Sequence, residues 1–197
     1  MDGTAAAARA LMHGRLEKRD TSVVSLNPNR GLGGAIRAGV AQARGEWIAT
    51  LDADLTFPPA SIKDLLAAAR GAKADLVAGS PYLRPGDMGQ VGWSRRLPSL
   101  MLNALYRGLF GMRLTSYTPV FRLYRASFLK GLALESEGFE INAEIAARAL
   151  LDKRVVVEVP APLTARVAGV SKLQRWRELR RHAALVARLL LPAVKKR

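Results

Sequence analysis

The feature that most constrains the fold is an alternation of short apolar runs with stretches of helical periodicity. The runs that predict strands are 21-TSVVSL-26, 46-EWIATLD-52, 74-ADLVAGS-80, 119-PVFRLY-124 and 154-RVVVEV-159. Between and around them, apolar residues recur every three or four positions, which predicts helices near 4–12, 31–44, 59–70, 94–110, 139–151 and 171–191. This order predicts β-α-β units, and therefore a three-layer α/β domain with a mostly parallel sheet.

Composition excludes several kinds of site. The 197 residues include no cysteine and only two histidines, His13 and His182, which are far apart in the sequence. Disulfides and thiol chemistry are therefore excluded, and a zinc site built from His and Cys is implausible. Neither histidine lies near a nucleophile motif of the Ser-His-Asp type.

The positive charge of the chain is unevenly distributed. The net charge is +15; residues 88–134 contain seven basic residues and no acidic ones, and residues 166–197 contain ten basic residues and one acid. Such regions favour anionic partners: nucleotide phosphates, lipid headgroups or nucleic acid. We expect neither a secretory signal at the start nor a membrane span at 183–194, a short apolar run that contains Arg188.

Two carboxylates, Asp52 and Asp54, follow the apolar run 46–52. Residues two apart on a strand point to the same side, and ligands of open α/β sheets bind beyond the carboxyl ends of the strands. The pair can therefore hold Mg²⁺ or Mn²⁺ and leave coordination positions for a diphosphate. The alternative is an acidic cap of a strand-to-turn junction, because Asp is common in turns.

Several motifs extend this observation along the chain: 29-NRGLGGAIRAG-39, 55-LTFPP-59, 79-GSPY-82, 120-VFRLYR-125, 137-EGFEINAEI-145 and 166-RVAGVSKL-173. In this order they resemble family 2 glycosyltransferases of the GT-A fold, and within them the polyprenyl-phosphate, dolichyl-phosphate mannosyltransferase-like branch. The resemblance implies a Rossmann-like catalytic domain over residues 1–165, incomplete at its N-terminus. A basic amphipathic helical region, a candidate membrane-surface contact, follows at 166–197.

The resemblance implies transfer of a sugar from a GDP- or UDP-linked donor to a polyprenyl phosphate by a metal-assisted, inverting single displacement. The attacking phosphate is largely ionised near neutral pH, so no strong general base is needed. The residues that the resemblance assigns are Asp52, Asp54, Arg122, Arg166 and Lys172 for catalysis; Asn29, Gly31, Gly33 and Asp52 for the donor; Arg125, Ser171 and Lys172 for the acceptor phosphate; and Asp52, Asp54 and Asn142 for the metal.

Each assignment has a simpler alternative. Arg122 and Arg125 can be solvent-exposed charges on an edge strand, and Gly31 and Gly33 can open a helix that packs tightly on its neighbours. Lys172 can belong to a solvated helix face. Glu144, which forms a polar pair with Asn142 on one helix, can be an ordinary surface acid.

A polyprenyl phosphate acceptor implies a peripheral protein on the inner, cytoplasmic face of the plasma membrane, with no nucleic-acid partner. The apolar stripes of 94–110 (Leu97, Leu100, Met101, Leu105 and Leu109) and of 171–191 (Leu173, Trp176, Leu179, Ala183, Val186 and Leu190) are candidate membrane contacts. The alternative is that both stripes pack on the core of the domain.

The sequence departs from the family pattern at its start and at three other places. Members of the family have a first β-α-β unit before the point at which this sequence begins, so we expect a short gene model or a fragment. Leu100, Ser116 with the pair Pro119–Val120, and Val170 replace residues common in the family. These changes keep two alternatives open: an inactive, basic lipid- or nucleic-acid-binding module, and a nucleotidyltransferase.

Overall fold

A four-stranded sheet forms the centre of the protein. The computed structural model describes residues 4–15, 21–87, 93–164 and 175–194. The strands are β1 (Trp47–Thr50), β2 (Leu76–Ser80), β3 (Arg122–Arg125) and β4 (Val156–Pro160), in the spatial order β1-β3-β2-β4. Strands β1, β2 and β4 run in one direction, whereas β3 lies between β1 and β2 and is antiparallel to both. The sheet is therefore mixed.

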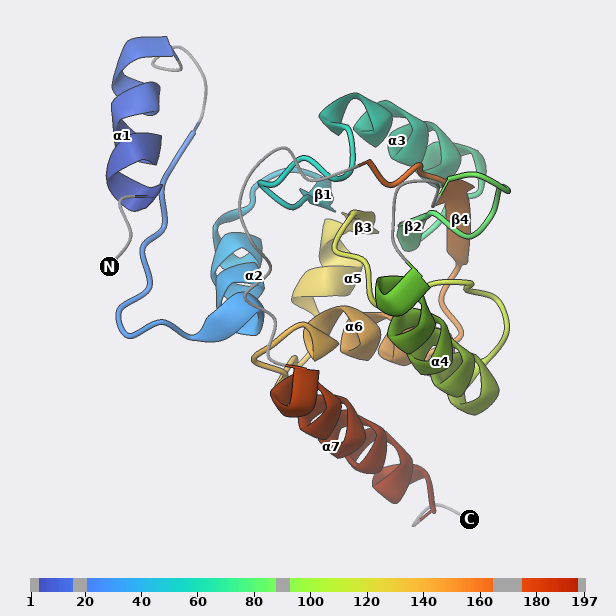
Figure 1. The fold of residues 1–197 in the computed structure, drawn as a ribbon. Coiled ribbons are helices and arrows are strands. Elements are labelled where there is room, and N and C mark those ends of the chain that lie inside the picture. Colours follow the sequence, from blue (N-terminus) through green and yellow to red (C-terminus); the bar gives the residue numbers. More distant parts are fainter. Residues whose placement is uncertain (1–3, 16–20, 88–92, 165–174, 195–197) are drawn as a thin grey trace.

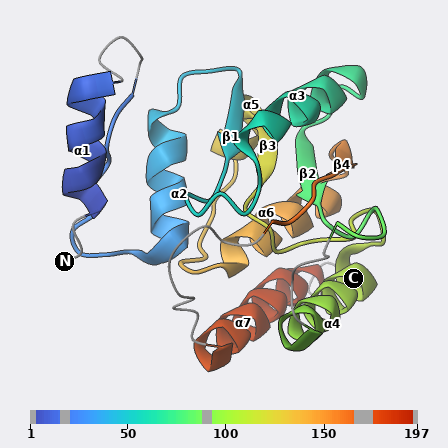
Figure 2. The same ribbon diagram turned by 45° about the horizontal axis from the view of Figure 1, so that its top comes forward.

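Helices cover both faces of this sheet, which confirms the predicted three-layer α/β domain (Figures 1 and 2). One face is covered by α3 (Ile62–Gly71), which a short 3-10 turn, η1 (Pro59–Ser61), precedes. The other is covered by α2 (Gly31–Gln42), α4 (Trp93–Phe110), α5 (Ala126–Lys130), α6 (Glu140–Leu151) and α7 (Arg175–Val194). Helix α1 (Thr4–Arg15) stands apart from the sheet in both views.

The two faces follow from the alternation of side chains along each strand. The cross-strand row Ile48–Tyr124–Leu76–Val156 faces α6 and its neighbours, and the next row, Ala49–Leu123–Val77–Val157, faces α3. All five residues of β2 are buried. A strand buried on both faces has a continuous apolar sequence, as 74–80 does.

Helix α3 illustrates how local sequence and packing agree. Its buried residues, Leu65 and Ala69, are four positions apart and form one face, which packs on the sheet. Asp64 lies in the first turn and Arg70 in the last, where each charge is favoured by the helix dipole. Pro58 has an extended backbone, and Pro59 is the first residue of η1, a position that suits proline.

Two expectations about the strands were wrong or incomplete. Residues 21–26 form no strand; they are largely solvent-exposed, with Val24 at 41% exposure, and they pair with no described strand. The predicted strand 119–124 is present as β3, but it is inserted antiparallel between β1 and β2. Six helices appear close to their predicted positions, and α5 is an additional short helix.

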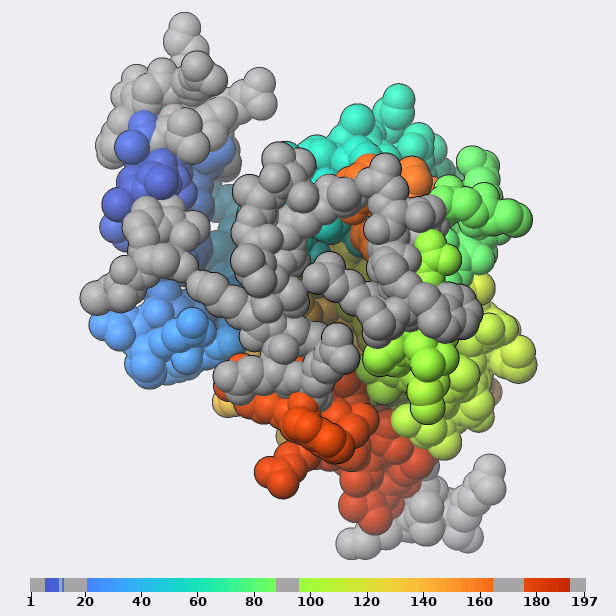
Figure 3. Space-filling model, in the orientation of Figure 1, coloured from blue at the N-terminus to red at the C-terminus, as the bar shows by residue number. Residues whose placement is uncertain are grey.

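Helices α4 and α7 pack on α6 with one face and leave apolar residues outside. In α7 the buried residues are Glu178, His182, Leu185 and Leu189, while Trp176 is 80% exposed and Leu179 and Leu191 are also exposed. The whole predicted stripe of α4 is exposed, with Met101 at 66%. The outer surfaces of α4 and α7 adjoin in the space-filling view (Figure 3). None of the described helices is both long and apolar enough to cross a bilayer.

Candidate functional site

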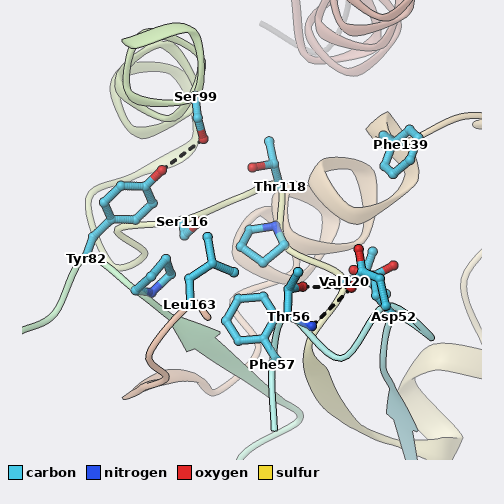
Figure 4. A pocket seen from close by; sticks show the side chains of 13 residues that line it. Asp52, Thr56, Phe57, Tyr82, Ser99, Ser116, Thr118, Val120, Phe139 and Leu163 are labelled. Atoms are coloured by element: carbon cyan, nitrogen blue, oxygen red, sulfur yellow. Dashed lines mark hydrogen bonds between the residues drawn. The ribbon is translucent and has the colours of Figure 1, made fainter. Parts of the chain in front are cut away.

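A cavity of about 300 Å³ lies beyond the carboxyl end of β1 (Figure 4). Its polar lining residues are Asp52, Asp54, Thr56, Tyr82, Ser99, Ser116 and Thr118, and its apolar ones are Phe57, Pro81, Pro119, Val120, Phe139 and Leu163. These residues come from the turn after β1, the loop after β2, α4, the loop before β3, the start of α6 and the segment after β4. The cavity therefore lies where ligands of open α/β sheets bind.

Both carboxylates of the D-A-D sequence line this cavity, but they lie in the turn after β1 and not on an extended strand, as the prediction assumed. Asp54 accepts hydrogen bonds from the amide of Thr56 (3.1 Å) and from its hydroxyl (2.9 Å). Leu55 has a positive φ of 56°, and its amide donates to the carbonyl of Asp52 (3.4 Å). The acidic pair is therefore held in a tight turn at the rim of the sheet.

The chemistry of the cavity fits a divalent metal with a phosphate ligand. Carboxylate oxygens are the hard ligands that Mg²⁺ and Mn²⁺ prefer. The described residues contain no cluster of three or more His, Cys, Asp or Glu side chains around one point. A metal held by Asp52 and Asp54 would therefore complete its coordination with diphosphate oxygens and water.

Asn142, the expected third ligand, does not line the cavity. It is fully buried on α6, and its side-chain nitrogen donates to the carbonyl of Phe139 (3.3 Å). Its Oδ1 has no hydrogen-bond partner in the part of the chain that the structure describes. In this arrangement Asn142 orients the first turn of α6, and a place in the metal shell would require it to move.

Arg122 is buried inside the protein. It is therefore neither a phosphate contact in the cavity nor a solvent-exposed charge on an edge strand. Its side chain is fully buried and is absent from the cavity lining. Its guanidinium donates to the carbonyls of Asn142 (2.5 Å) and Tyr117 (2.7 Å). Arg122 therefore connects β3 to α6 and to the loop that lines the cavity.

Arg125 lies at the other end of the sheet from the acidic pair. Because β3 is antiparallel to β1, Arg125 is opposite Trp47 at the start of β1, whereas Arg122 is opposite Thr50 at its end. The Arg125 guanidinium lies over the Trp47 ring and forms ion pairs with Glu46 and Asp75, both at 3.6 Å. The structure does not bring this arginine together with Asp52 and Asp54.

The glycine-rich segment packs against protein backbone. The side chain of Asn29 accepts a hydrogen bond from the amide of Gly31 (2.8 Å), which forms a turn into α2. Gly31 has a φ of +66°, and a Cβ on Gly33 would lie 2.0 Å from the carbonyl oxygen of Ser136. The amide of Gly33 donates to the carbonyl of Glu137 (2.7 Å). The tight-packing alternative for these glycines is what this geometry supports.

Glu144 is a buried structural acid rather than a surface residue. It accepts hydrogen bonds from the amide of Ser136 (2.9 Å) and from Arg148 (3.0 Å), and Arg188 of α7 lies 3.3 Å away. Burial alone would raise the pKa of Glu144, but the hydrogen bonds and the nearby arginines outweigh it, so the pKa is lowered. Glu144 thereby ties α7 to the segment before α6.

Three of the predicted site residues, Arg166, Ser171 and Lys172, lie outside the described residues, as does Val170. Among the other cavity residues, Ser99, Thr118 and Leu163 were not singled out from the sequence. Tyr82 is hydrogen-bonded to Ser99 of α4 (2.9 Å), which joins two sides of the cavity. Tyr82 belongs to the GSPY motif, but Ser99 and Thr118 have no pattern around them that would mark them.

Known proteins resemble this chain in sequence and in structure. The family model "Glycosyl transferase family 2" matches residues 1–132. A polyprenol monophosphomannose synthase of Mycolicibacterium smegmatis is 33% identical over 183 residues, which cover 87% of this chain and 66% of the relative. An undecaprenyl-phosphate mannosyltransferase of Micrococcus luteus is 38% identical over 152 residues, which cover 73% and 60%.

Among solved structures, glucosyl-3-phosphoglycerate synthase from Mycobacterium tuberculosis in complex with phosphoglyceric acid has a TM-score of 0.59 at 19% identity. A complex of that enzyme with Mn²⁺, UDP and glucosyl-3-phosphoglycerate has a TM-score of 0.57. Both alignments cover 96% of this chain and 64% of the solved one. The likeness confirms the GT-A fold, and the chain spans about two thirds or less of the length of these relatives.

Proposed function

The chain belongs to glycosyl transferase family 2, and from this premise we propose that it transfers a mannosyl residue from a nucleotide-linked donor to a polyprenyl phosphate. The observation that carries the proposal is the placement of Asp52 and Asp54 together on one cavity at the carboxyl end of β1. The printed activities of the two mannosyltransferase relatives support the choice of sugar and acceptor.

The proposed reaction is a single displacement. An oxygen of the acceptor phosphate forms a bond to the anomeric carbon of the sugar while the bond from that carbon to the nucleoside diphosphate breaks. A bound Mg²⁺ or Mn²⁺ would offset the negative charge that develops on the departing diphosphate. The acceptor phosphate is already ionised near neutral pH, so the chemistry is compatible with a cavity whose described lining residues include no histidine.

The residues of the chain have distinct roles in this proposal. Asp52 and Asp54 hold the metal and thereby the donor diphosphate. Thr56 fixes the carboxylate of Asp54 through its two hydrogen bonds. The hydroxyls of Tyr82, Ser99 and Thr118 give the cavity polar groups for the sugar or the acceptor. Arg166, Ser171 and Lys172, in the R-V-x-G-x-S-K-L motif, remain the proposed contacts of the acceptor phosphate.

A membrane-surface location is part of the same proposal. The predicted stripe of α4 and the stripe residues Trp176 and Leu179 of α7 are exposed, whereas Val186 and Leu190 of α7 pack against the core, as the alternative predicts. Exposed arginines lie beside the exposed apolar residues of α7, among them Arg177 and Arg180. Apolar side chains with basic flanks are typical of helices that lie on an anionic lipid surface, such as the inner face of a plasma membrane.

The experiment that tests the proposal compares wild-type protein with Asp54→Asn. Asparagine keeps the oxygen that accepts the bonds from Thr56, so the turn should persist while the charge is lost. We expect Mn²⁺ with GDP or UDP to raise the thermal stability of the wild type. At a hundredfold excess over Kd the gain is about 2.7 kcal/mol. The variant should unfold at the same temperature as wild type without ligand and should show no gain with it.

A matched control is Asp152→Asn, which changes an exposed aspartate at the end of α6 that is absent from the cavity lining. It should respond to Mn²⁺ and nucleotide as the wild type does. Transfer of mannose from GDP-mannose to undecaprenyl phosphate should follow the same pattern. A wild-type protein that binds anionic vesicles but no nucleotide would contradict the proposal and favour the inactive, basic lipid-binding module.

A further inference from the structure

One wall of the cavity is made by residues 115–120, which we call the 115–120 wall. Four of these six residues line the cavity, Ser116, Thr118, Pro119 and Val120. The wall is a loop between α4 and β3, and its main-chain groups form no sheet pairing. A loop of this kind keeps one shape only if its backbone groups find partners elsewhere.

Those partners come largely from one row of residues across the sheet. Thr50 of β1 is directly opposite Arg122 of β3, Arg122 is opposite Ala78 of β2, and Ala78 is opposite Glu158 of β4. Directly opposed residues point to the same face of a sheet, so the four side chains form a line across all four strands. This row includes the last residue of β1 and lies on the face that α6 covers, and we call it the anchoring row.

Three members of the anchoring row hold the backbone of the 115–120 wall. Glu158 accepts hydrogen bonds from the amides of Thr115 (2.7 Å) and Ser116 (3.0 Å), one on each carboxylate oxygen. Arg122 donates to the carbonyl of Tyr117 (2.7 Å). The hydroxyl of Thr50 donates to the carbonyl of Val120. The loop is therefore fixed at both ends and in the middle.

Ala78 explains how two charged side chains of the row reach the loop. It is fully buried between Arg122 and Glu158, and its single methyl group leaves space above the sheet for the loop backbone. Burial raises the pKa of Glu158, while the bonds from Thr115 and Ser116 and the charge of Arg122 oppose that effect. The carboxylate of Glu158 thus accepts hydrogen bonds from main-chain amides although its burial disfavours the charged form.

The wall presents a polar atom that finds no partner in the described part of the chain. Ser116 is fully buried, lines the cavity, and its hydroxyl oxygen makes no hydrogen bond within the described residues. Buried hydroxyls nearly always have a partner, so this one is suited to meet a polar group of a bound molecule. The amide of the same residue is held by Glu158.

We propose that Glu158 is a positioning residue: together with Arg122 and Thr50 it fixes the 115–120 wall so that Ser116 and Thr118 meet the sugar that is transferred. This inference rests on the proposed function. It predicts a separation of effects, because the acidic pair is held by its own turn at Asp54 and Thr56 and not by the anchoring row. Loss of Glu158 should disturb transfer and leave metal-dependent nucleotide binding in place.

The test uses Glu158→Gln. The side-chain NH₂ group of glutamine replaces one carboxylate oxygen and cannot accept a hydrogen bond from a backbone amide. The matched control is Asp75→Asn, a carboxylate of the same sheet that accepts from the amide of Val155 (3.2 Å) at the end away from the cavity. Three quantities are measured for each: hydrogen exchange of the 115–120 amides, Kd for GDP or UDP with Mn²⁺, and kcat for transfer from GDP-mannose to undecaprenyl phosphate.

We expect Glu158→Gln to raise exchange at 115–120 and to lower kcat, each at least tenfold, with Kd within twofold of wild type. Asp75→Asn should leave kcat and exchange at 115–120 as in wild type. If Glu158→Gln does not fold, Thr50→Val removes the bond to Val120 at the other end of the wall and carries the same expectations.

Unchanged exchange at 115–120, or faster exchange with an unchanged kcat, would overturn the inference, as would an equal loss of kcat in Asp75→Asn. Failure of the proposed function would look different, because wild-type protein would then neither bind nucleotide with Mn²⁺ nor transfer mannose. The exchange comparison between the two variants would in that case decide alone whether the anchoring row fixes the wall.

Discussion

Substitution of Gly33 by alanine tests whether the glycine-rich segment is a packing device or a phosphate-binding loop. A Cβ at this position would lie 2.0 Å from the carbonyl oxygen of Ser136 and 2.7 Å from the Cα of Glu137. Both are backbone atoms, and they belong to a segment that is itself held by Glu144 and Glu140. The new methyl group therefore cannot be accommodated by rotation of a side chain.

The magnitude follows from three contributions. Overpacking of this kind costs about 1–3 kcal/mol. Displacement of α2 would also weaken the hydrogen bond from the Gly33 amide to Glu137, which contributes about 1 kcal/mol. Alanine is favoured over glycine in a helix by about 1 kcal/mol, which offsets part of the loss. The net expectation is a decrease of about 2 kcal/mol, or about 4–8 °C in Tm for a domain of this size.

Urea denaturation of the variant, followed by far-UV circular dichroism, measures this change. Gly39→Ala is a control on the same helix, where a Cβ would meet nothing within 4 Å. It should stabilise the protein by about 0.5–1 kcal/mol, so the two variants should shift in opposite directions. If Gly33→Ala were as stable as Gly39→Ala but bound nucleotide less tightly, the packing argument would be refuted and the phosphate loop restored.

Three further outcomes are expected. Burial lowers the pKa of His182, whose Nδ1 is 2.8 Å from the hydroxyl of Tyr106; the unfolded chain therefore binds a proton first as pH falls. The stability due to this neutral histidine is complete above its ordinary pKa of 6.5 and is lost at lower pH, and His182→Phe should flatten that slope in urea titrations from pH 8 to 5. Leu65→Ala should cost about 2–5 kcal/mol in the same assay, because Leu65 is fully buried under the sheet, and a cost below about 1 kcal/mol would contradict that packing. Exchange of the exposed Met101 and Leu105 for aspartate should leave Tm unchanged and weaken binding to phosphatidylglycerol vesicles at least tenfold in a sedimentation assay; equal binding would remove α4 from the proposed membrane surface.

Much of the fold could be predicted because its signals are local. The run 74–80 is apolar throughout and becomes a strand buried on both faces, and 59–70 has the helical period of α3. The segment 21–26 has a similar composition but joins none of the described strands, since a strand also requires a neighbour that its own sequence does not supply. The antiparallel insertion of β3 is a property of the assembled sheet, so alternation along the chain could not reveal it.

The residues of the candidate site likewise divide into those that local sequence predicts and those whose place depends on the assembled sheet. Asp52 and Asp54 were predicted to lie together because they follow an apolar run that ends at the edge of the sheet; both line the cavity, from the turn after β1 rather than from the strand itself. Arg122 and Arg125 are the two ends of β3 and therefore lie at opposite ends of the sheet. Because β3 is antiparallel to β1, it is Arg122 that lies at the cavity end. Glu158 looks like one polar residue in a strand, and its role depends on a loop more than forty residues earlier in the chain.

The position of β3 also governs when the sheet can form during synthesis. β1 and β2 are made first, but they are not neighbours, and the strand that joins them begins only at Arg122. At about 5–20 residues per second, the ribosome needs several seconds to proceed from Ser80 to Arg125. For that interval two apolar segments have no native partner on the nascent chain, and they are the surfaces that we expect a chaperone to cover.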